Sequence, residues 1–329
     1  MVVLAAGCGG STKSGGGSTT LVGAGSTLVA PLVAKWSADY AERTGVTVTY
    51  GAIGSGGGIA QITGRTVDFG ASDAPLTPDQ ASSCSGCVQV PWALAATLVS
   101  YHLKGAPNRL KLSGPLLARI FLGQVKRWND PAIMQLNPGV KLPDRPITPV
   151  YRSDGSGDTY AFTDFLTKVS PEWKQGPGAS TQVSFPSGIG GKGNDGVAAA
   201  VQRQDGAIGY LAIPYVFSNH LDYALVQNAA GKFPVPGVAS ISAAAKSVST
   251  IPSDNAVSIA DPPASAAGAY PISTFTYAIV PKSSSKAEAL RRFLTYATAE
   301  GQKFGKPLQF APLPAQVLAV DKKAIAKVQ

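Results

Sequence analysis

The sequence predicts an α/β protein built on a sheet of parallel-type strands. Three observations predict this class: short apolar and β-branched segments alternate with segments of helical periodicity, glycine-rich turns separate several of them, and each such turn follows a strand and precedes a helix. Alternation of this kind builds parallel sheets, which bind ligands at the carboxyl ends of their strands. At 329 residues the chain has the length of two domains.

The first three strand–helix units lie near the N-terminus. Apolar residues recur at four-residue steps from Leu28 through Trp36 to Tyr40, which is one face of a helix. The third strand carries Asp73 at its carboxyl end. We expect strands at residues 20–23, 46–50 and 66–73, and helices at 28–40 and 59–63.

The rest of the chain continues this alternation. A second long glycine-rich turn lies at residues 188–196, and residues 228–269, rich in Ala, Ser, Pro and Gly, predict a helix with loops. We expect strands at residues 90–101, 147–151, 207–211 and 270–281, and helices at 114–121, 158–168, 197–201 and 287–299.

Composition limits the classes of function. Hydrophobic residues make up 44% of the chain and charged residues 14%, as in a folded globular protein, and no apolar run approaches the ~20 residues that span a bilayer. The net charge is +9, but Lys and Arg are scattered, without a basic tract or a basic–aromatic motif. We therefore expect no nucleic-acid partner, and expect the excess charge to attract an anion or an anionic surface.

Three cysteines and two histidines supply little for a metal site. Cys84 and Cys87, with two residues between them, have the spacing of half a zinc site or of a redox pair, but no second pair or nearby His completes either. This spacing favours a short structural disulfide in an oxidising compartment over free thiols. We expect no metal and no cofactor.

The third cysteine lies near the N-terminus. Residues 4–8 (LAAGC) resemble a bacterial lipobox, in which Cys8 becomes the lipidated first residue of the mature protein. Ala5 stands where Leu is usual, and a charged segment before it is missing. The Gly/Ser-rich residues after Cys8 favour a flexible tether, so we assign residues 1–19 to a lipobox remnant and tether. The alternative is an unstructured tail with an idle thiol.

Residues 151–159 (YRSDGSGDT) carry the strongest functional signal. Arg152 offers a planar fork of donors, Ser156 a hydroxyl and Gly157 a backbone amide, directly before a predicted helix. The turns at residues 23–27 and 54–58 likewise place Thr27 and Ser55 at helix starts. Together the three turns predict a site for a dehydrated tetrahedral oxyanion. The structural alternatives are an ion pair of Arg152 with a carboxylate such as Asp154, and ordinary helix capping by the hydroxyls.

Two carboxylates near these turns select among anions. Asp73 and Asp158 repel an anion unless it carries a proton that they can accept. Phosphate, with a second pKa of about 6, retains such a proton near neutral pH. Sulfate has none, so the site is expected to admit phosphate and reject sulfate. The alternative for Asp158 is a helix-start charge that points to solvent.

Catalysis has little support in the sequence. A serine hydrolase needs a base beside Ser156, and neither His102 nor His220 lies in a motif that places it there. The Gly191-Lys192-Gly193 turn lacks the hydroxyl and the glycine spacing of a P-loop. These residues favour binding without covalent change.

The motifs, in this order, resemble the phosphate-binding subunit of bacterial phosphate ABC importers, a family of periplasmic binding proteins. The resemblance runs from about residue 20 to the end of the chain. It rests on residues 23–27, 54–58, 68–75, 152–157 and 190–196.

The resemblance implies a two-lobed, type II periplasmic-binding-protein fold, with two hinge strands and the ligand in the cleft between the lobes. Lobe I would comprise residues 20–95 plus 270–329, and lobe II residues 96–269. It further implies a monomer on the outer face of the cell membrane, held there by the lipid anchor, that delivers phosphate to a membrane permease. The alternatives are a phosphate-ester hydrolase on the same scaffold and a receptor for another tetrahedral oxyanion.

The resemblance also implies the ligand set, from which this chain departs at two positions. Leu28 replaces a common Phe, which matters little where only its amide binds. Asp158 replaces a common Thr, so an acceptor stands in place of a donor; this and the lipobox resemble actinobacterial members. We expect Asp158 to face the ligand beside the other phosphate-binding residues, namely Thr27, Leu28, Ser55, Asp73, Arg152, Ser156 and Gly157.

Overall fold

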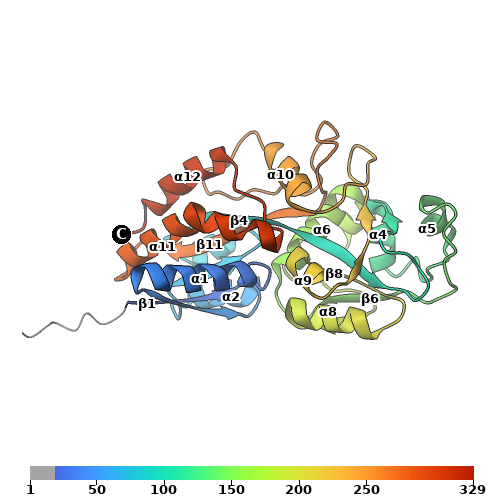
Figure 1. The fold of residues 1–329 in the computed structure, drawn as a ribbon, viewed down its shortest axis with the longest axis horizontal. Helices are drawn as coiled ribbons and strands as arrows, with labels where there is room; N and C mark the ends of the chain where they lie inside the picture. Colours follow the sequence, from blue (N-terminus) through green and yellow to red (C-terminus); the bar gives the residue numbers. More distant parts are fainter. Residues whose placement is uncertain (1–18) are drawn as a thin grey trace, which may run out of the picture.

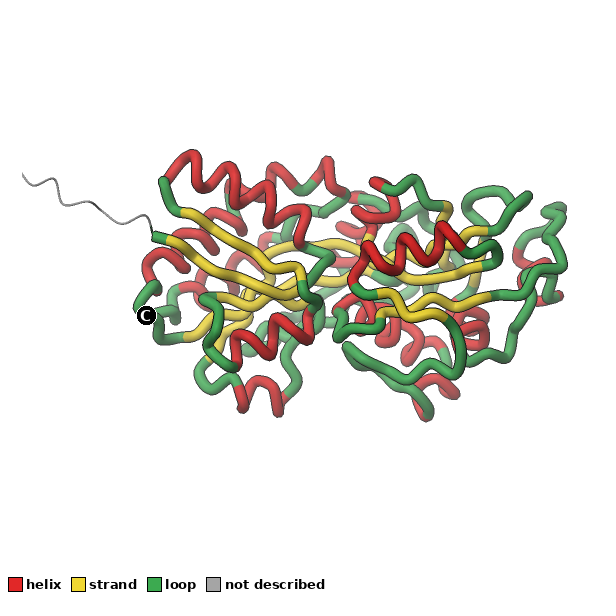
Figure 2. The backbone as a smooth tube through the Cα atoms, turned by 90° about the horizontal axis from the view of Figure 1, so that it is seen from below, coloured by secondary structure: helices red, strands yellow, loops and turns green. Residues whose placement is uncertain are grey.

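The computed structural model describes residues 19–329 and consists of two lobes that lie side by side along its longest axis (Figure 1). The predicted lipobox with Cys8 and the tether up to residue 18 lie outside the described residues. We call the half that contains the strands of residues 20–72 and 273–281 the first lobe, and the half that contains the strands of residues 148–152 and 189–212 the second lobe. In each lobe helices lie on both sides of the strands (Figure 2).

One sheet of nine strands runs through both lobes in the order β2-β1-β3-β11-β4-β8-β6-β7, with β9 beside β4, and a separate small sheet pairs β10 with β5. The strands are β1 (Thr20–Gly25), β2 (Thr47–Ala52), β3 (Phe69–Ser72), β4 (Cys87–His102), β5 (Lys111–Leu112), β6 (Thr148–Arg152), β7 (Ile189–Gly191), β8 (Ala207–Ala212), β9 (Asp222–Tyr223), β10 (Leu225–Val226) and β11 (Ser273–Pro281).

The α-helices cover these strands. They are α1 (Ala30–Thr44), α2 (Ser55–Thr63), α3 (Pro78–Ser83), α4 (Gly114–Phe121), α5 (Pro131–Leu136), α6 (Gly157–Val169), α7 (Pro171–Gln175), α8 (Gly193–Arg203), α9 (Ile213–Ser218), α10 (Val238–Lys246), α11 (Ala287–Thr298) and α12 (Ala315–Ile325), and two 3₁₀ helices, Glu300–Phe304 and Lys306–Leu308, follow α11. No helix among residues 19–329 combines the length and apolarity of a membrane span.

The long strand β4 connects the lobes. Its first part pairs with β11 of the first lobe up to Ala96, and from Thr97 to His102 it pairs with β8 of the second lobe. The change of partner therefore falls between Ala96 and Thr97. Near this point the amide of Thr97 donates to the carbonyl of Ile272, next to the start of β11, so the chain passes between the lobes at two adjacent places.

The parallel pairing expected from the sequence describes part of this sheet. Strand β1 is parallel to β2 and β3, and β6 is parallel to β7 and β8. The two connecting strands differ, because β11 is antiparallel to β3 and β4, and β4 is antiparallel to β8. The fold is a mixed α/β sheet, in which parallel units in each lobe flank antiparallel strands at the centre.

The glycine turn at residues 54–58 forms the first turn of a helix. The sequence predicts a helix only from about residue 59, but α2 begins at Ser55 because its glycines allow close approach to the sheet. A Cβ at Gly58 would lie 2.5 Å from the Cα of Gly25 and 2.7 Å from the carbonyl oxygen of Ala24. The first turn of α2 therefore packs directly on the end of β1, where a side chain would separate them.

Aromatic residues fill the core of the first lobe. Trp36 on α1 packs edge-on against Trp92 on β4, and Trp92 in turn contacts Phe69 on β3 and Phe293 on α11. All four side chains are fully buried. The apolar face predicted from residues 28–40 thus anchors α1 against strands that end at the interface between the lobes.

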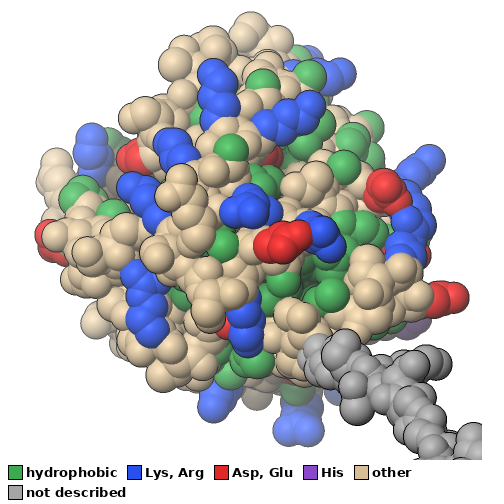
Figure 3. Space-filling model, turned by 90° about the vertical axis from the view of Figure 1, so that its left-hand side faces the viewer, with side chains coloured by type: hydrophobic (Ala, Val, Ile, Leu, Met, Phe, Trp, Pro, Cys, Tyr) green, Lys and Arg blue, Asp and Glu red, His purple; other side chains and the backbone are tan. Residues whose placement is uncertain are grey.

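Charge is spread thinly over the end of the first lobe (Figure 3). On the end of the first lobe, Lys and Arg side chains lie singly among uncharged ones, with an occasional Asp or Glu between them (Figure 3). This agrees with the scattered sequence positions of the basic residues.

Candidate anion-binding site

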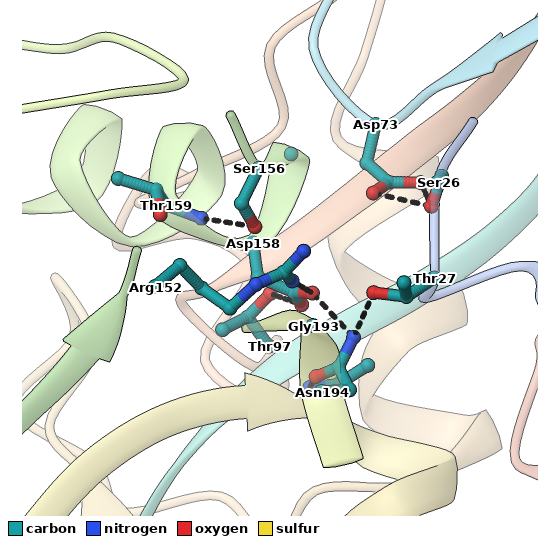
Figure 4. A network of polar contacts seen from close by, with 12 residues as sticks. Ser26, Thr27, Asp73, Thr97, Arg152, Ser156, Asp158, Thr159, Gly193 and Asn194 are labelled. Carbon is teal, nitrogen blue, oxygen red and sulfur yellow. Dashed lines mark hydrogen bonds and ion pairs between the residues drawn. The ribbon is translucent and has the colours of Figure 1, made fainter. Parts of the chain in front are cut away.

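The three hydroxyl-bearing turns meet between the lobes: Figure 4 shows Thr27 facing the region of Arg152 and Ser156, and hydrogen bonds place Ser55 against Asp73 and Gly157. Thr27 follows β1, Ser55 is the first residue of α2, and Asp73 follows β3, so all three lie at the carboxyl ends of first-lobe strands. From the second lobe, Arg152 ends β6 and Ser156 caps α6. Parallel strands place their carboxyl ends at one edge of the sheet, which explains why these positions converge.

Several hydrogen bonds cross directly from one lobe to the other. The Gly157 amide donates to Ser55 Oγ at 3.0 Å, and the Gly56 amide donates to the Gly155 carbonyl at 2.9 Å. Gly157 also lies against Asp73, because a Cβ there would come within 2.4 Å of Asp73 Cβ. The lobes are therefore closed on each other in this structure, and no larger residue fits at position 157.

Arg152 is buried, with 4% of its surface exposed. Its Nε and Nη2 donate to the two carboxylate oxygens of Asp154 at 2.8 and 2.6 Å, and Nη1 donates to Asp158 at 3.1 Å. The ion pair that the sequence left open as an alternative is thus present. A guanidinium has five N–H groups; these bonds use three of them, so two are left for an oxyanion.

Asp154 holds the guanidinium in place. Partial burial raises the pKa of Asp154, but the bonds from Arg152 and from the Gly193 amide at 3.0 Å lower it by more, so the net shift is downward. Asp154 is therefore ionised at neutral pH. The Arg152–Asp154 pair is close to neutral as a whole, so it offers directed donors more than net charge.

Asp158 is completely buried and does not point to solvent, so the helix-start alternative is wrong in that respect. Its Oδ1 accepts from Thr97 Oγ1 at 2.7 Å, and its Oδ2 accepts from Arg152 and from Asn194 Nδ2 at 2.8 Å. Burial raises the pKa of Asp158, and the charge of Arg152 opposes that shift. Asp158 thus helps to position the guanidinium of Arg152. Direct contact between Asp158 and a ligand stays a prediction.

Asp73 faces these groups from the first lobe. Ser26 Oγ lies 2.6 Å from both of its oxygens, and Ser55 Oγ lies 3.4 Å from Oδ2. Burial, together with the charge of Asp158, raises the pKa of Asp73 to about 8. Asp73 therefore holds a proton at neutral pH in this arrangement.

The remaining hydroxyls have defined partners as well. Ser156 Oγ accepts from the Thr159 amide at 3.3 Å and so caps α6, which the sequence also left open as an alternative. Ser55 Oγ accepts from the amides of Gly157 and Asp73. Thr27 Oγ1 accepts from Asn194 Nδ2 at 2.7 Å, and Leu28 follows it into the buried start of α1. Hydroxyls that accept in this way keep their own proton for another acceptor.

The sequence reasoning missed three polar members of this site: Ser26, Thr97 and Asn194. Ser26 lies inside the recognised motif at residues 23–27 but was passed over for its neighbour. Asn194 lies in the glycine-rich turn at 188–196, where asparagine is ordinary turn chemistry. Thr97 interrupts the apolar strand β4, and a threonine in a strand carries no signal of its own.

The cysteines and histidines lie apart from this site. Cys84 and Cys87 are joined in a disulfide, and Arg65 donates to the nearby carbonyls of Cys84 and Ser85. The two histidines line a separate cavity beside β4 and β9, which does not include Ser156. Within residues 19–329 no three His, Cys, Asp or Glu side chains gather to hold a metal ion.

Comparisons with known proteins place the chain in a class. Residues 10–300 match the PBP superfamily domain. Among solved structures, a high affinity periplasmic phosphate-binding protein (PfluDING) bound with phosphate superposes with a TM-score of 0.75 at 22% identity, covering 93% of each chain. A phosphate-binding protein from Stenotrophomonas maltophilia gives 0.74 at 20% identity, covering 93% of this chain and 94% of that one. The fold is that of the periplasmic phosphate-binding proteins.

Sequence relatives narrow the class. The phosphate-binding protein PstS of Xylella fastidiosa (strain Temecula1) is 42% identical over 300 residues, which are 90% of this chain and 82% of that protein. The PstS of Pasteurella multocida is 40% identical over 91% of this chain and 87% of its own, and PstS 3 of Mycobacterium leprae is 34% identical over 91% and 84%. This chain belongs to the PstS family of phosphate-binding proteins.

Proposed function

We propose that this protein binds inorganic phosphate between its lobes and delivers it to the permease of a phosphate ABC importer. One observation carries the proposal: in a member of the PstS family, the two lobes bring hydroxyl and guanidinium donors and two buried carboxyls to a single region. The ligand donors would be Thr27, the Leu28 amide, Ser55, Arg152, Ser156 and the Gly157 amide, with Asp73 and Asp158 as acceptors.

Asp73 would supply the selection against sulfate. A carboxyl with a pKa of about 8 and a phosphate can hold one proton between them, whichever of the two carries it. Sulfate brings no proton, so with Asp73 ionised it would leave two negative groups in contact. Rejection of sulfate should therefore strengthen as the pH rises past the pKa of Asp73.

Lobe closure would couple binding to transport. The bond from the Gly157 amide to Ser55 Oγ would give way to bonds from both groups to the ligand, since the amide has one proton to donate. The two adjacent crossings near Thr97 and Ile272 suit a hinge. The boundaries at residues 95/96 and 269/270 belong to this proposal. The change of β4 from β11 to β8 between Ala96 and Thr97 supports the first of them.

The lipid anchor also belongs to the proposal, as does the likeness to actinobacterial members. Cys8, with the Gly/Ser-rich residues after it, would tether the receptor outside the cytoplasmic membrane. In a bacterium that processes lipoproteins, wild type should carry diacylglycerol and fractionate with membranes, and Cys8→Ser should be released with unchanged phosphate binding. An unmodified mass of the wild-type protein would refute the anchor.

A calorimetric titration with phosphate, arsenate and sulfate at pH 8 tests the function. Phosphate should bind with one site per chain, and sulfate should bind at least about tenfold more weakly, since it leaves a buried carboxylate unpaired. Equal affinity for phosphate and sulfate would favour a receptor for oxyanions in general. Turnover of a chromogenic phosphate ester under the same conditions would favour the hydrolase instead.

A further inference from the structure

We propose that Asn194 is a positioning residue that fixes the Thr27 hydroxyl as a hydrogen-bond donor to the bound anion, and that it does so only when the lobes are closed. The inference rests on the proposed phosphate function. Asn194 donates to Thr27 and Asp158, which are proposed to face the ligand, and it does not need to touch the ligand itself.

The orientation of the Asn194 amide is determined by its surroundings. Asn194 lies in the first turn of α8 and is fully buried. Its Oδ1 accepts from the backbone amide of Ala212, at the end of β8, at 2.7 Å. A backbone N–H can only donate, so the oxygen of Asn194 must face Ala212 and the NH₂ group must face the other way.

The two protons of that NH₂ group go to two different lobes. One is donated to Thr27 Oγ1 of the first lobe at 2.7 Å, and the other to Asp158 Oδ2 of the second lobe at 2.8 Å (Figure 4). Asp158 also pairs with Arg152. Asn194 therefore joins the hydroxyl of one lobe to the charged pair of the other.

This contact decides what the Thr27 hydroxyl can do. A hydroxyl has one proton to donate. Because Thr27 Oγ1 already accepts from an NH₂ group, its own proton is directed elsewhere, which suits an anion that needs donors. The Tyr215 hydroxyl, also of the second lobe, holds the Thr27 carbonyl at 2.9 Å and fixes the residue further.

Thr27 differs from Ser156 in the source of this orientation. Ser156 accepts from the amide of Thr159 within its own helix, so it is oriented whether the lobes are open or closed. Thr27 obtains its partner from a side chain across the interface. Opening the lobes removes Asn194 from Thr27 and frees the hydroxyl to rotate, so the donor becomes directed as closure occurs.

A double-mutant cycle tests the inference. In the wild-type background, Asn194→Ala should weaken phosphate binding by about 10- to 100-fold, the range for hydrogen bonds that act on a charged group. In a Thr27→Val background, which has no hydroxyl to orient, the same change should weaken binding at least about threefold less. In a Thr27→Ser background, which keeps the hydroxyl, the effect should stay close to the wild-type value.

A second variant reverses the polarity of the contact. Asn194→Asp keeps the size and the bond from Ala212 but offers Thr27 an acceptor, which draws its proton away from the anion. It also places a second carboxylate against Asp158, so its effect is compared between the Thr27 and Thr27→Val backgrounds. It should weaken phosphate binding more than Asn194→Ala does, and thermal unfolding without phosphate shows that each variant is folded.

The outcomes separate the two proposals. If wild type binds phosphate but Asn194→Ala has the same effect in all three Thr27 backgrounds, the proposed role of Asn194 is wrong and the phosphate function stands. Should Asn194→Ala fail to fold, Asn194→Asp decides: an effect on phosphate affinity that is absent, or that is the same with Thr27 and with Thr27→Val, overturns the inference. If wild type binds no phosphate, both the phosphate function and the role of Asn194 are refuted.

Discussion

Replacing Arg152 with alanine removes the only guanidinium in the site and leaves its two carboxylate partners without a cation. Arg152 donates two bonds to Asp154 and one to Asp158, and all three side chains are at least largely buried. Truncating one member of a buried, hydrogen-bonded charge pair costs about 2–5 kcal/mol in binding. Phosphate affinity should therefore fall by roughly 30- to 4,000-fold.

The same change should reduce stability, because two acids lose their counter-charge. Breaking a buried ion pair from one side costs about 3–5 kcal/mol. Part of this loss should be relieved by protonation of Asp158, whose pKa burial already raises. Arg152→Ala should thus be less stable than wild type in the absence of phosphate, by less at pH 5 than at pH 8.

Calorimetric titration and urea unfolding of Arg152→Ala measure the two effects separately. Arg145→Ala is a matched control, because Arg145 pairs with Asp205 in the same lobe with half of its side chain exposed. That variant should change neither quantity by more than about 1 kcal/mol. If Arg152→Ala changes phosphate affinity by less than about threefold, which is ~0.7 kcal/mol, Arg152 is a structural residue and the ligand binds elsewhere.

Three further predictions concern buried acids. Asp321 on α12 is buried, neither of its oxygens has a hydrogen-bond partner among the described residues, and burial raises its pKa to about 8. The folded state holds a proton that the unfolded state loses near pH 4, so the free energy of unfolding should fall as pH rises from 4 to 8. In urea unfolding, Asp321→Leu should flatten that pH dependence and be more stable than wild type by roughly 2–4 kcal/mol at pH 8. An unchanged pH dependence would contradict this. Asp73→Asn puts an NH₂ donor where phosphate places its proton, so competition titrations should show the preference for phosphate over sulfate reduced by about tenfold or more; an undiminished preference would exclude Asp73 from selection. Asp158→Thr should flatten the decline of phosphate affinity with rising pH, whereas parallel titration curves would mean that Asp158 acts only through Arg152.

The sequence predicted the parts of the fold that depend on local pattern. Four-residue apolar periodicity predicted α1, and a run of β-branched residues predicted β2. The expected helix at residues 287–299 and the expected strands at 147–151 and 207–211 match α11, β6 and β8 within about one residue at each end. The antiparallel pairing of β4 with β11 joins segments more than 170 residues apart, and no local pattern reports it. Helix α12 and strand β7 (Ile189–Gly191) were also missed, the latter because glycines are poor strand formers.

The candidate site was predictable where charge or glycine marks it. Arg152, Ser156 and the two glycine turns stand out in the sequence, and the structure brings them together. Asn194 and Thr97 acquire their roles only from what they face. The role of Asn194 depends on its contacts with Ala212, Thr27 and Asp158, which come from three segments far apart in the sequence.

A crystal structure of the protein with phosphate is the most direct test of the central claim, that both lobes bind one phosphate ion. The account predicts a single phosphate between the lobes, within hydrogen-bonding distance of Arg152, Ser156 and Thr27, with one of its oxygens facing the carboxyl of Asp73. A phosphate that contacts only one lobe, or that binds away from Arg152 and Asp73, would contradict it.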